Sequence, residues 1–162
     1  MKIILRDLND TMEMGRILGS HAAEGTVFAV IGDLGAGKTS LAQGVAIGLG
    51  VHESSYVNSP TFTLHQRHEG RTRFHHVDLY RLNSTEELVN LGLRELVGVD
   101  GISYIEWPSR APDLIPSEAV WVKLEFFEEG RAISFGHSHP DALHFIEQVC
   151  NLARQSLTVA PP

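Results

Sequence analysis

The chain has 162 residues, of which 43% are hydrophobic and 20% are charged; these proportions are typical of a folded globular protein and exclude wholesale disorder. Its 13 basic and 20 acidic side chains give a net charge of −7, which argues against a protein that grips nucleic acid through many phosphate contacts. The one cysteine, Cys150, excludes an internal disulfide. We expect a single domain over residues 1–158 and a frayed tail over residues 159–162.

The apolar segments are short, and none approaches the roughly 18 residues that a bilayer crossing requires. The first seven residues contain Lys2, Arg6 and Asp7, and no long apolar core follows them as it would in a secretory signal. We therefore expect a cytoplasmic protein with no membrane association.

The first half of the chain alternates segments with strand-like and helix-like patterns. In chain order we expect an edge strand over 2–8, a helix over 11–23, a strand over 26–31, a glycine-rich loop over 32–37 and a helix over 38–49. Asn9 or Asp10 is the candidate cap of the first helix. The run 26–31 is continuously apolar, as a strand buried on both faces requires.

The second half is richer in strand patterns. We expect hairpin strands over 61–68 and 72–77, a helix from 84 towards 96, a buried strand over 102–105, a second hairpin with strands 119–127 and 132–135 around a turn at 128–131, and a closing helix over 140–154. This alternation predicts an α/β fold: a three-layer domain like that of the P-loop NTPases, with a mixed, mainly parallel central sheet and β-hairpins.

The most informative segment, residues 32–39, reads Gly-Asp-Leu-Gly-Ala-Gly-Lys-Thr and matches the pattern G-x-x-x-x-G-K-[ST]. Its glycines allow the backbone to wrap a phosphate with N–H groups, and the following helix presents its positive end to the anion. Lys38 would reach the β- and γ-phosphates and Thr39 would place its hydroxyl on Mg²⁺. The predicted nucleotide-binding residues of this segment are Gly32, Asp33, Leu34, Gly35, Ala36, Gly37, Lys38, Thr39 and Ser40.

A phosphate loop normally works with a carboxylate at the end of a neighbouring strand, which positions Mg²⁺ or polarises the attacking water. Asp78 ends the segment 74–78, and Glu106 ends the more apolar segment 102–106, which is the better central strand. Either acid alone also fits a solvated strand end. Beside the phosphate loop we interpret Lys38, Asp78 and Glu106 as the candidate catalytic residues.

Two motifs of common GTPases, Asn-Lys-x-Asp and Asp-x-x-Gly, are absent, which favours adenine as the base. Two rival functions stay open at this point. Arg67, Arg71 and Arg73 surround one hairpin and are a weak candidate for the lid of a small-molecule kinase, although a solvated hairpin explains them better. A non-hydrolysing, ATP-sensing interaction module fits the same loop. The nine histidines have no cysteine partner and no helical metal-binding spacing, so we interpret them as surface or core residues, with the exception of His76, which lies two residues before Asp78.

Four segments follow one another in a specific order and spacing: 32–39, Ser59-Pro60-Thr61-Phe62, the run His-Val-Asp-Leu-Tyr-Arg-Leu over 76–82, and Ile-Glu-Trp-Pro over 105–108. Together they closely resemble the bacterial TsaE family, small P-loop ATPases of tRNA threonylcarbamoyladenosine (t6A) biosynthesis. The resemblance covers roughly residues 5–137.

The resemblance implies the roles of individual residues. Lys38 and the loop backbone would hold the phosphates of ATP, Thr39 and Glu106 would position Mg²⁺, and Asp78 would support hydrolysis near the γ-phosphate. Residues 59–62 would form a switch-like segment that senses the nucleotide. Thr11 matches an element near the base, Arg131 a late turn that approaches the nucleotide, and Trp107 a tryptophan beside the metal-binding acid. Without the resemblance, Phe62 and Tyr80 fit core aromatics equally well.

The resemblance also implies partners, namely the proteins TsaD and TsaB, which transfer the threonylcarbamoyl group to adenosine of tRNA. A member of the family binds that pair in its ATP-bound form, and hydrolysis permits repeated turnover. An acidic subunit of this kind need not hold tRNA itself, so we expect tRNA to be reached only through the partners.

Overall fold

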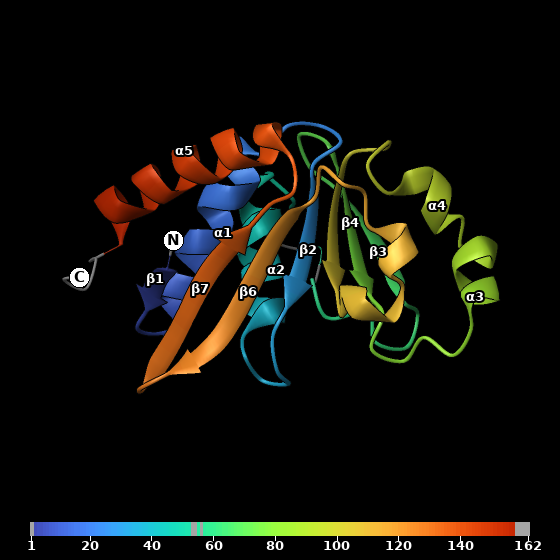
Figure 1. The fold of residues 1–162 in the computed structure, drawn as a ribbon, viewed down its shortest axis with the longest axis horizontal. Coiled ribbons are helices and arrows are strands. Elements are labelled where there is room, and N and C mark those ends of the chain that lie inside the picture. The colour runs from blue at the N-terminus through green and yellow to red at the C-terminus, as the bar shows by residue number, and fades with distance from the viewer. Residues whose placement is uncertain (1, 53–54, 56, 158–162) are drawn as a thin grey trace.

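The structure is a computed structural model that describes residues 2–52, 55 and 57–157. These residues contain one mixed sheet of seven strands (Figure 1). The strands follow the order β1-β7-β6-β2-β5-β4-β3 across the sheet. They are β1 (Lys2–Leu5), β2 (Val27–Ile31), β3 (His65–Glu69), β4 (Arg73–Asp78), β5 (Ile102–Glu106), β6 (Val120–Phe127) and β7 (Gly130–Gly136). The predicted tail 159–162 lies outside the described residues.

The four central strands β6, β2, β5 and β4 are parallel, and antiparallel strands flank them on both sides. The predicted mixed sheet with a parallel centre, the edge strand β1 and both hairpins are therefore confirmed. In the register of the sheet Val30 pairs with Glu106, and Glu106 pairs with Asp78. The two predicted acids thus sit side by side at the edge where β2 leads into the glycine-rich loop.

Helices cover both faces of the sheet, as the three-layer prediction requires. Phe28 and Val30 of β2 point into one core with the helices α1, α2 and α5, whereas Val27 and Ala29 point into a second core with α3, α4 and short 3₁₀ turns. The helices are α1 (Leu8–His21), α2 (Lys38–Gly48), α3 (Thr85–Asn90), α4 (Leu93–Leu96) and α5 (Pro140–Ser156). Figure 1 shows α3 and α4 beyond β3 and β4, away from α1 and α5.

The first helix starts earlier than predicted. Its cap is Asp7, whose Oδ1 accepts a hydrogen bond of 2.9 Å from the backbone N–H of Asp10, so the proposed caps Asn9 and Asp10 are wrong. Asp10 instead accepts hydrogen bonds from Arg6. Because the helix already begins at Leu8 and its cap is Asp7, the strand cannot extend to residue 8, and β1 ends at Leu5.

Left-handed backbone conformations change the bounds of three other predicted elements. Gly92 has φ 62° and divides the segment 84–96 into α3 and α4. Leu64 has φ 61° and its N–H bonds to the carbonyl of Pro60, so residues 61–64 form a turn and β3 begins only at His65. The second hairpin turns at Glu128 and Glu129 alone, with Glu128 at φ 49°.

Helices α1 and α2 touch through their backbones at four glycines. Gly15 of α1 faces Gly44 of α2, Gly19 of α1 faces the main chain of Val45, and Gly48 of α2 faces the main chain of Arg16. A Cβ atom on Gly15 would lie 2.4 Å from the carbonyl oxygen of Leu41. Such an approach is closer than any side chain permits, so only glycine fits. Within the described residues, no helix is both long enough and apolar enough to span a bilayer.

Candidate nucleotide-binding site

The glycine-rich loop connects the end of β2 to the start of α2, as predicted. Gly35 has φ 79° and Gly37, which caps α2, has φ 102°, conformations that strain any residue with a side chain. On neighbouring β5, the buried hydroxyl of Tyr104 donates a hydrogen bond of 2.6 Å to the carbonyl of Lys38. The centre of the sheet thereby holds the first turn of α2, whose N–H groups face the site.

The ammonium of Lys38 lies inside the loop. It donates hydrogen bonds of 2.8 and 2.9 Å to the carbonyls of Gly32 and Asp33, and it sits 4.5 Å from the centre of the Trp107 ring. Only 5% of the residue is exposed. Burial lowers the pKa of Lys38, while the nearby carboxylates of Glu106 and Asp78 oppose that shift.

The residues predicted to perform the chemistry line one pocket of about 600 Å³. Lys38 and Thr39 enter it from α2, Asp78 from the end of β4 and Glu106 from the end of β5. Both acids are 3% exposed. The structure therefore brings together side chains that are 67 positions apart in the chain, from Thr39 to Glu106, because parallel strands end at the same edge of the sheet.

Asp78 is bound to the segment that the sequence suggested as a switch. Its Oδ2 accepts a hydrogen bond of 3.0 Å from Thr61 Oγ1 and another from Ser59 Oγ, and its Oδ1 accepts one of 2.9 Å from the backbone N–H of Tyr80. The conformation of residues 59–61 is thus coupled to the carboxylate in the pocket.

Phe62 and Tyr80, the two aromatic residues that were also compatible with the core, lie outside it. Phe62 is 82% exposed and Tyr80 is 38% exposed, so the alternative of two core aromatics is wrong. The Tyr80 ring contacts the ring of Trp107, with centroids 5.0 Å apart, and both residues line the pocket. Trp107 has φ 58°, which turns the chain sharply after Glu106.

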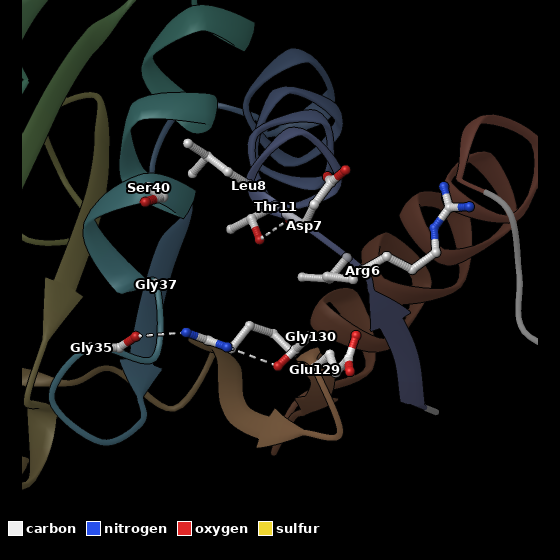
Figure 2. A pocket seen from close by; sticks show the side chains of 11 residues that line it. Arg6, Asp7, Leu8, Thr11, Gly35, Gly37, Ser40, Glu129 and Gly130 are labelled. Carbon is white, nitrogen blue, oxygen red and sulfur yellow. Dashed lines mark hydrogen bonds between the residues drawn. The ribbon is translucent and has the colours of Figure 1, made fainter.

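A second pocket, of about 310 Å³, lies on the other side of the loop (Figure 2). Thr11 enters it from α1, Arg131 from β7 and Ser40 from α2. It shares Gly35, Gly37 and Ser40 with the larger pocket, so the loop and the start of α2 form the wall between the two. This arrangement gives room for a nucleoside next to its phosphates.

Arg131 holds the outer side of the loop. Its Nε and Nη2 donate hydrogen bonds of 3.2 Å to the carbonyls of Ala36 and Gly35, and its guanidinium lies 4.3 Å from the centre of the Phe126 ring. Because a peptide unit is planar and trans, a carbonyl that faces Arg131 directs the N–H of the same unit the opposite way.

Three predicted binding residues line neither of these pockets. Gly32, Asp33 and Ala36 instead offer backbone carbonyls to Lys38 and Arg131, and so act on the shape of the loop. Leu34 lines the larger pocket with 74% of its surface exposed. The arginines 67, 71 and 73 lie on the β3–β4 hairpin and line neither pocket. They are not all solvated as expected, because Arg71 donates a hydrogen bond of 2.8 Å to the carbonyl of Gly19 in α1 and Arg73 pairs with Asp100.

The oxygen donors of the larger pocket suit Mg²⁺, which binds through one or two carboxylates, substrate phosphates and water. Thr39 supplies a hydroxyl and Glu106 a carboxylate on its wall. Among the described residues, no three or more His, Cys, Asp or Glu side chains gather as a self-sufficient metal cage. The donor set therefore fits a metal that arrives with a nucleotide.

Sequence reasoning missed Tyr104 as part of the site, and it singled out His76 without giving it a partner or a role. Tyr104 stands two residues before Glu106 in an apolar strand, and its only signal is a hydroxyl that needs a partner when buried. His76 stands two residues before Asp78, and its Nε2 lies 2.8 Å from Oε1 of Glu106.

A strand, a glycine-rich loop and a helix, with two acids at the ends of neighbouring parallel strands, define an α/β protein of the phosphate-loop class. The model of the family "Threonylcarbamoyl adenosine biosynthesis protein TsaE" matches residues 5–133. The chain belongs to this TsaE family.

Individual relatives agree with this assignment. The tRNA threonylcarbamoyladenosine biosynthesis protein TsaE of Treponema pallidum is 37% identical, over 80% of this chain and 95% of that protein. Its counterpart in Synechocystis is 43% identical, over 73% of this chain and 76% of that protein. The crystal structure of YdiB from Bacillus subtilis superposes with a TM-score of 0.80 and 25% identity, covering 93% of this chain and 94% of that one.

Proposed function

We propose that the protein binds Mg·ATP at the phosphate loop and hydrolyses it in support of t6A biosynthesis by the TsaD–TsaB pair. The observation that carries the ATPase part is the meeting of Lys38, Thr39, Asp78 and Glu106 in one pocket beside the loop. Membership of the TsaE family supports the pathway. The net charge of −7 supports a subunit that reaches tRNA through its partners, and we propose the cytoplasm as its location.

The phosphates of ATP would be bound by the N–H groups of the loop and the first turn of α2, together with Lys38. Mg²⁺, held by Thr39 and Glu106, would neutralise charge on the β- and γ-phosphates when bound. Lys38 would turn from the carbonyls of Gly32 and Asp33 to the phosphates, which gives its buried ammonium stronger partners.

Asp78 would orient the water that attacks the γ-phosphate in line with the leaving oxygen. Its carboxylate is already engaged by Thr61, Ser59 and the N–H of Tyr80, so it must exchange a partner before it can hold a water. This supports slow hydrolysis by the protein alone and faster hydrolysis when a partner rearranges residues 59–61.

The smaller pocket would receive the nucleoside, with Thr11 and Arg131 beside it. The absence of both GTPase motifs from the full sequence supports adenine. The close contact of α1 and α2 supports this placement, since it sets Thr11 at a fixed position relative to the loop.

The test is release of inorganic phosphate from ATP by the protein alone and after addition of purified TsaD and TsaB, with Lys38→Ala as the inactive control. We expect slow release alone, a rise with the pair, and loss of both in the variant. No rise with the pair would contradict the pathway. Phosphate transferred to an acceptor metabolite would favour a kinase, and ATP binding with no turnover under either condition would favour a non-hydrolysing module.

A further inference from the structure

His76 and Glu106 form a buried hydrogen-bonded pair beneath the larger pocket. Nε2 of His76 lies 2.8 Å from Oε1 of Glu106, and the two residues are 0% and 3% exposed. They belong to the adjacent parallel strands β4 and β5, two register positions apart. Because an ionised carboxylate only accepts hydrogen bonds, the imidazole donates from Nε2.

The rest of the imidazole packs against two aromatic rings. Its ring stacks on Phe74, with centroids 6.1 Å apart, and meets the edge of Tyr104 at 5.5 Å. Nδ1 is buried and has no hydrogen-bond partner among the described residues. A buried polar atom without a partner destabilises a protein, whereas an apolar side chain of similar size would pack here without that loss. The hydrogen bond to Glu106 is therefore the contact that explains a histidine at this position.

This bond restricts the side chain of Glu106. A glutamate has three rotatable side-chain bonds, and here one oxygen is engaged from below while the residue lines the pocket above. Oε1 is taken by His76, and Oε2 is the oxygen that remains for a ligand. A hydrogen bond that fixes a metal-binding side chain typically changes metal affinity by about 10–100-fold when it is removed.

We propose that His76 is a positioning residue: its Nε2–H holds Glu106 in the orientation that binds the metal of Mg·ATP. This inference rests on the proposed function, since it assigns Glu106 to the metal. It concerns a residue that touches neither the nucleotide nor the metal, and acts only through Glu106.

Two amide substitutions separate positioning from packing. In His76→Gln the amide nitrogen takes the place of Nε2 and keeps the donor to Glu106. In His76→Asn the amide is of the same chemical type, but its nitrogen takes the place of Nδ1 and falls short of Glu106. Both replacements remove the ring contacts with Phe74 and Tyr104. A purely structural role would therefore affect the two variants alike.

The readout is equilibrium binding of a fluorescent ATP analogue during titration with Mg²⁺, and again in EDTA. We expect the Mg²⁺ concentration for half-maximal enhancement of binding to rise about tenfold in His76→Asn and less than threefold in His76→Gln. Binding in EDTA should stay within twofold of the unmodified protein in both. The control is His75→Gln, which replaces the adjacent buried histidine that bonds to Asp100 on the opposite face of β4.

A double-mutant cycle completes the test. In a Glu106→Gln background, His76→Asn should cause no further shift of the Mg²⁺ midpoint, because the residue it positions has lost its charge. Equal midpoints in His76→Gln and His76→Asn, or an undiminished effect in the Glu106→Gln background, would overturn the assignment of His76. Binding that is independent of Mg²⁺ in the unmodified protein would instead overturn the proposed metal site, and the assignment of His76 with it.

Discussion

Thr61 Oγ1 donates a hydrogen bond of 3.0 Å to Oδ2 of Asp78, and this bond joins the loop before β3 to the end of β4. A hydrogen bond to a carboxylate is worth about 1.5–3 kcal/mol, and Ser59 Oγ bonds to the same oxygen, so residues 59–61 are held against Asp78.

Replacing Thr61 by valine keeps the shape of the side chain and removes the donor. We expect amide hydrogen exchange of residues 59–64 to become about tenfold faster in Thr61→Val, and ATP hydrolysis to change while ATP affinity stays within about threefold. The control is Thr63→Val, an exposed neighbour on the same loop. Equal exchange in the two variants would contradict the coupling of this loop to Asp78.

Removing the ammonium of Lys38 should abolish turnover. We expect Lys38→Ala to weaken ATP binding by at least about tenfold, because several charge-assisted hydrogen bonds to phosphate are lost together. Calorimetric titration measures the affinity and circular dichroism checks the fold. Lys123→Ala is the matched control, since Lys123 is an exposed lysine of β6 that pairs with Glu125. An unchanged affinity in Lys38→Ala would contradict the site.

Thr39→Ala and Glu106→Ala should act on the metal more than on the nucleotide. We expect each to raise the Mg²⁺ concentration needed for half-maximal hydrolysis by about tenfold or more, with a smaller change of ATP binding in EDTA. Mg²⁺ titration of phosphate release provides the measurement. If neither substitution alters the metal requirement, Thr39 and Glu106 do not form the metal site.

A methyl group at Gly15 should destabilise the whole fold. Its Cβ would lie 2.4 Å from the carbonyl of Leu41 and 2.8 Å from Cα of Gly44, so α1 and α2 must separate. We expect Gly15→Ala to lower the free energy of unfolding by about 2 kcal/mol or more. Gly136→Ala is the control, because its Cβ would make only an ordinary contact of 3.6 Å with Trp121. Urea denaturation compares the two, and similar midpoints would contradict the tight helix contact.

Acid should destabilise the β3–β4 hairpin through His65. Burial, followed by the nearby His75, lowers the pKa of His65 to about 4. In the unfolded chain His65 binds a proton with a pKa of about 6.5, whereas in the folded protein it stays neutral until the pH approaches 4. The contribution of His65 to the free energy of unfolding is therefore fully present above about pH 6.5 and is lost as the pH falls towards 4.

The urea midpoint of the unmodified protein should therefore fall more steeply between pH 7 and pH 5 than that of His65→Gln. The hydrogen bond of 2.9 Å between Nε2 of His65 and Nδ1 of His75 fits this expectation, because the two facing nitrogens share one proton. His144→Gln, an exposed histidine of α5, is the matched control. Parallel midpoints for the unmodified protein and His65→Gln would contradict the prediction.

The loop and its two acids were predictable because their signals are local. The pattern of residues 32–39 needs no knowledge of the rest of the chain, and Asp78 and Glu106 each directly follow a predicted strand. Parallel pairing then places both acids at the loop. The packing of α1 against α2 beside the loop was not predictable in the same way, because the sequence of residues 8–21 does not indicate which helix they contact.

Contacts between distant residues lay beyond the sequence. The bond from Tyr104 to Lys38 joins positions 66 apart, and the one from Arg131 to Ala36 joins positions 95 apart. The cap of α1 was missed for a different reason. Asp7, Asn9 and Asp10 are all residue types suited to the cap, and the choice among them depends on where the preceding strand leaves the sheet.

The glycine contact of α1 and α2 also decides how the protein tolerates change. Thr11 and Ser40 stand on two helices whose main chains touch, so the spacing of these two pocket residues is set by main-chain atoms and not by the size of core side chains. Conservative exchanges of aliphatic residues in the core will therefore change the free energy of unfolding before they change the width of this pocket. Stability and ligand selection can consequently change independently, except at the four glycines, where they change together.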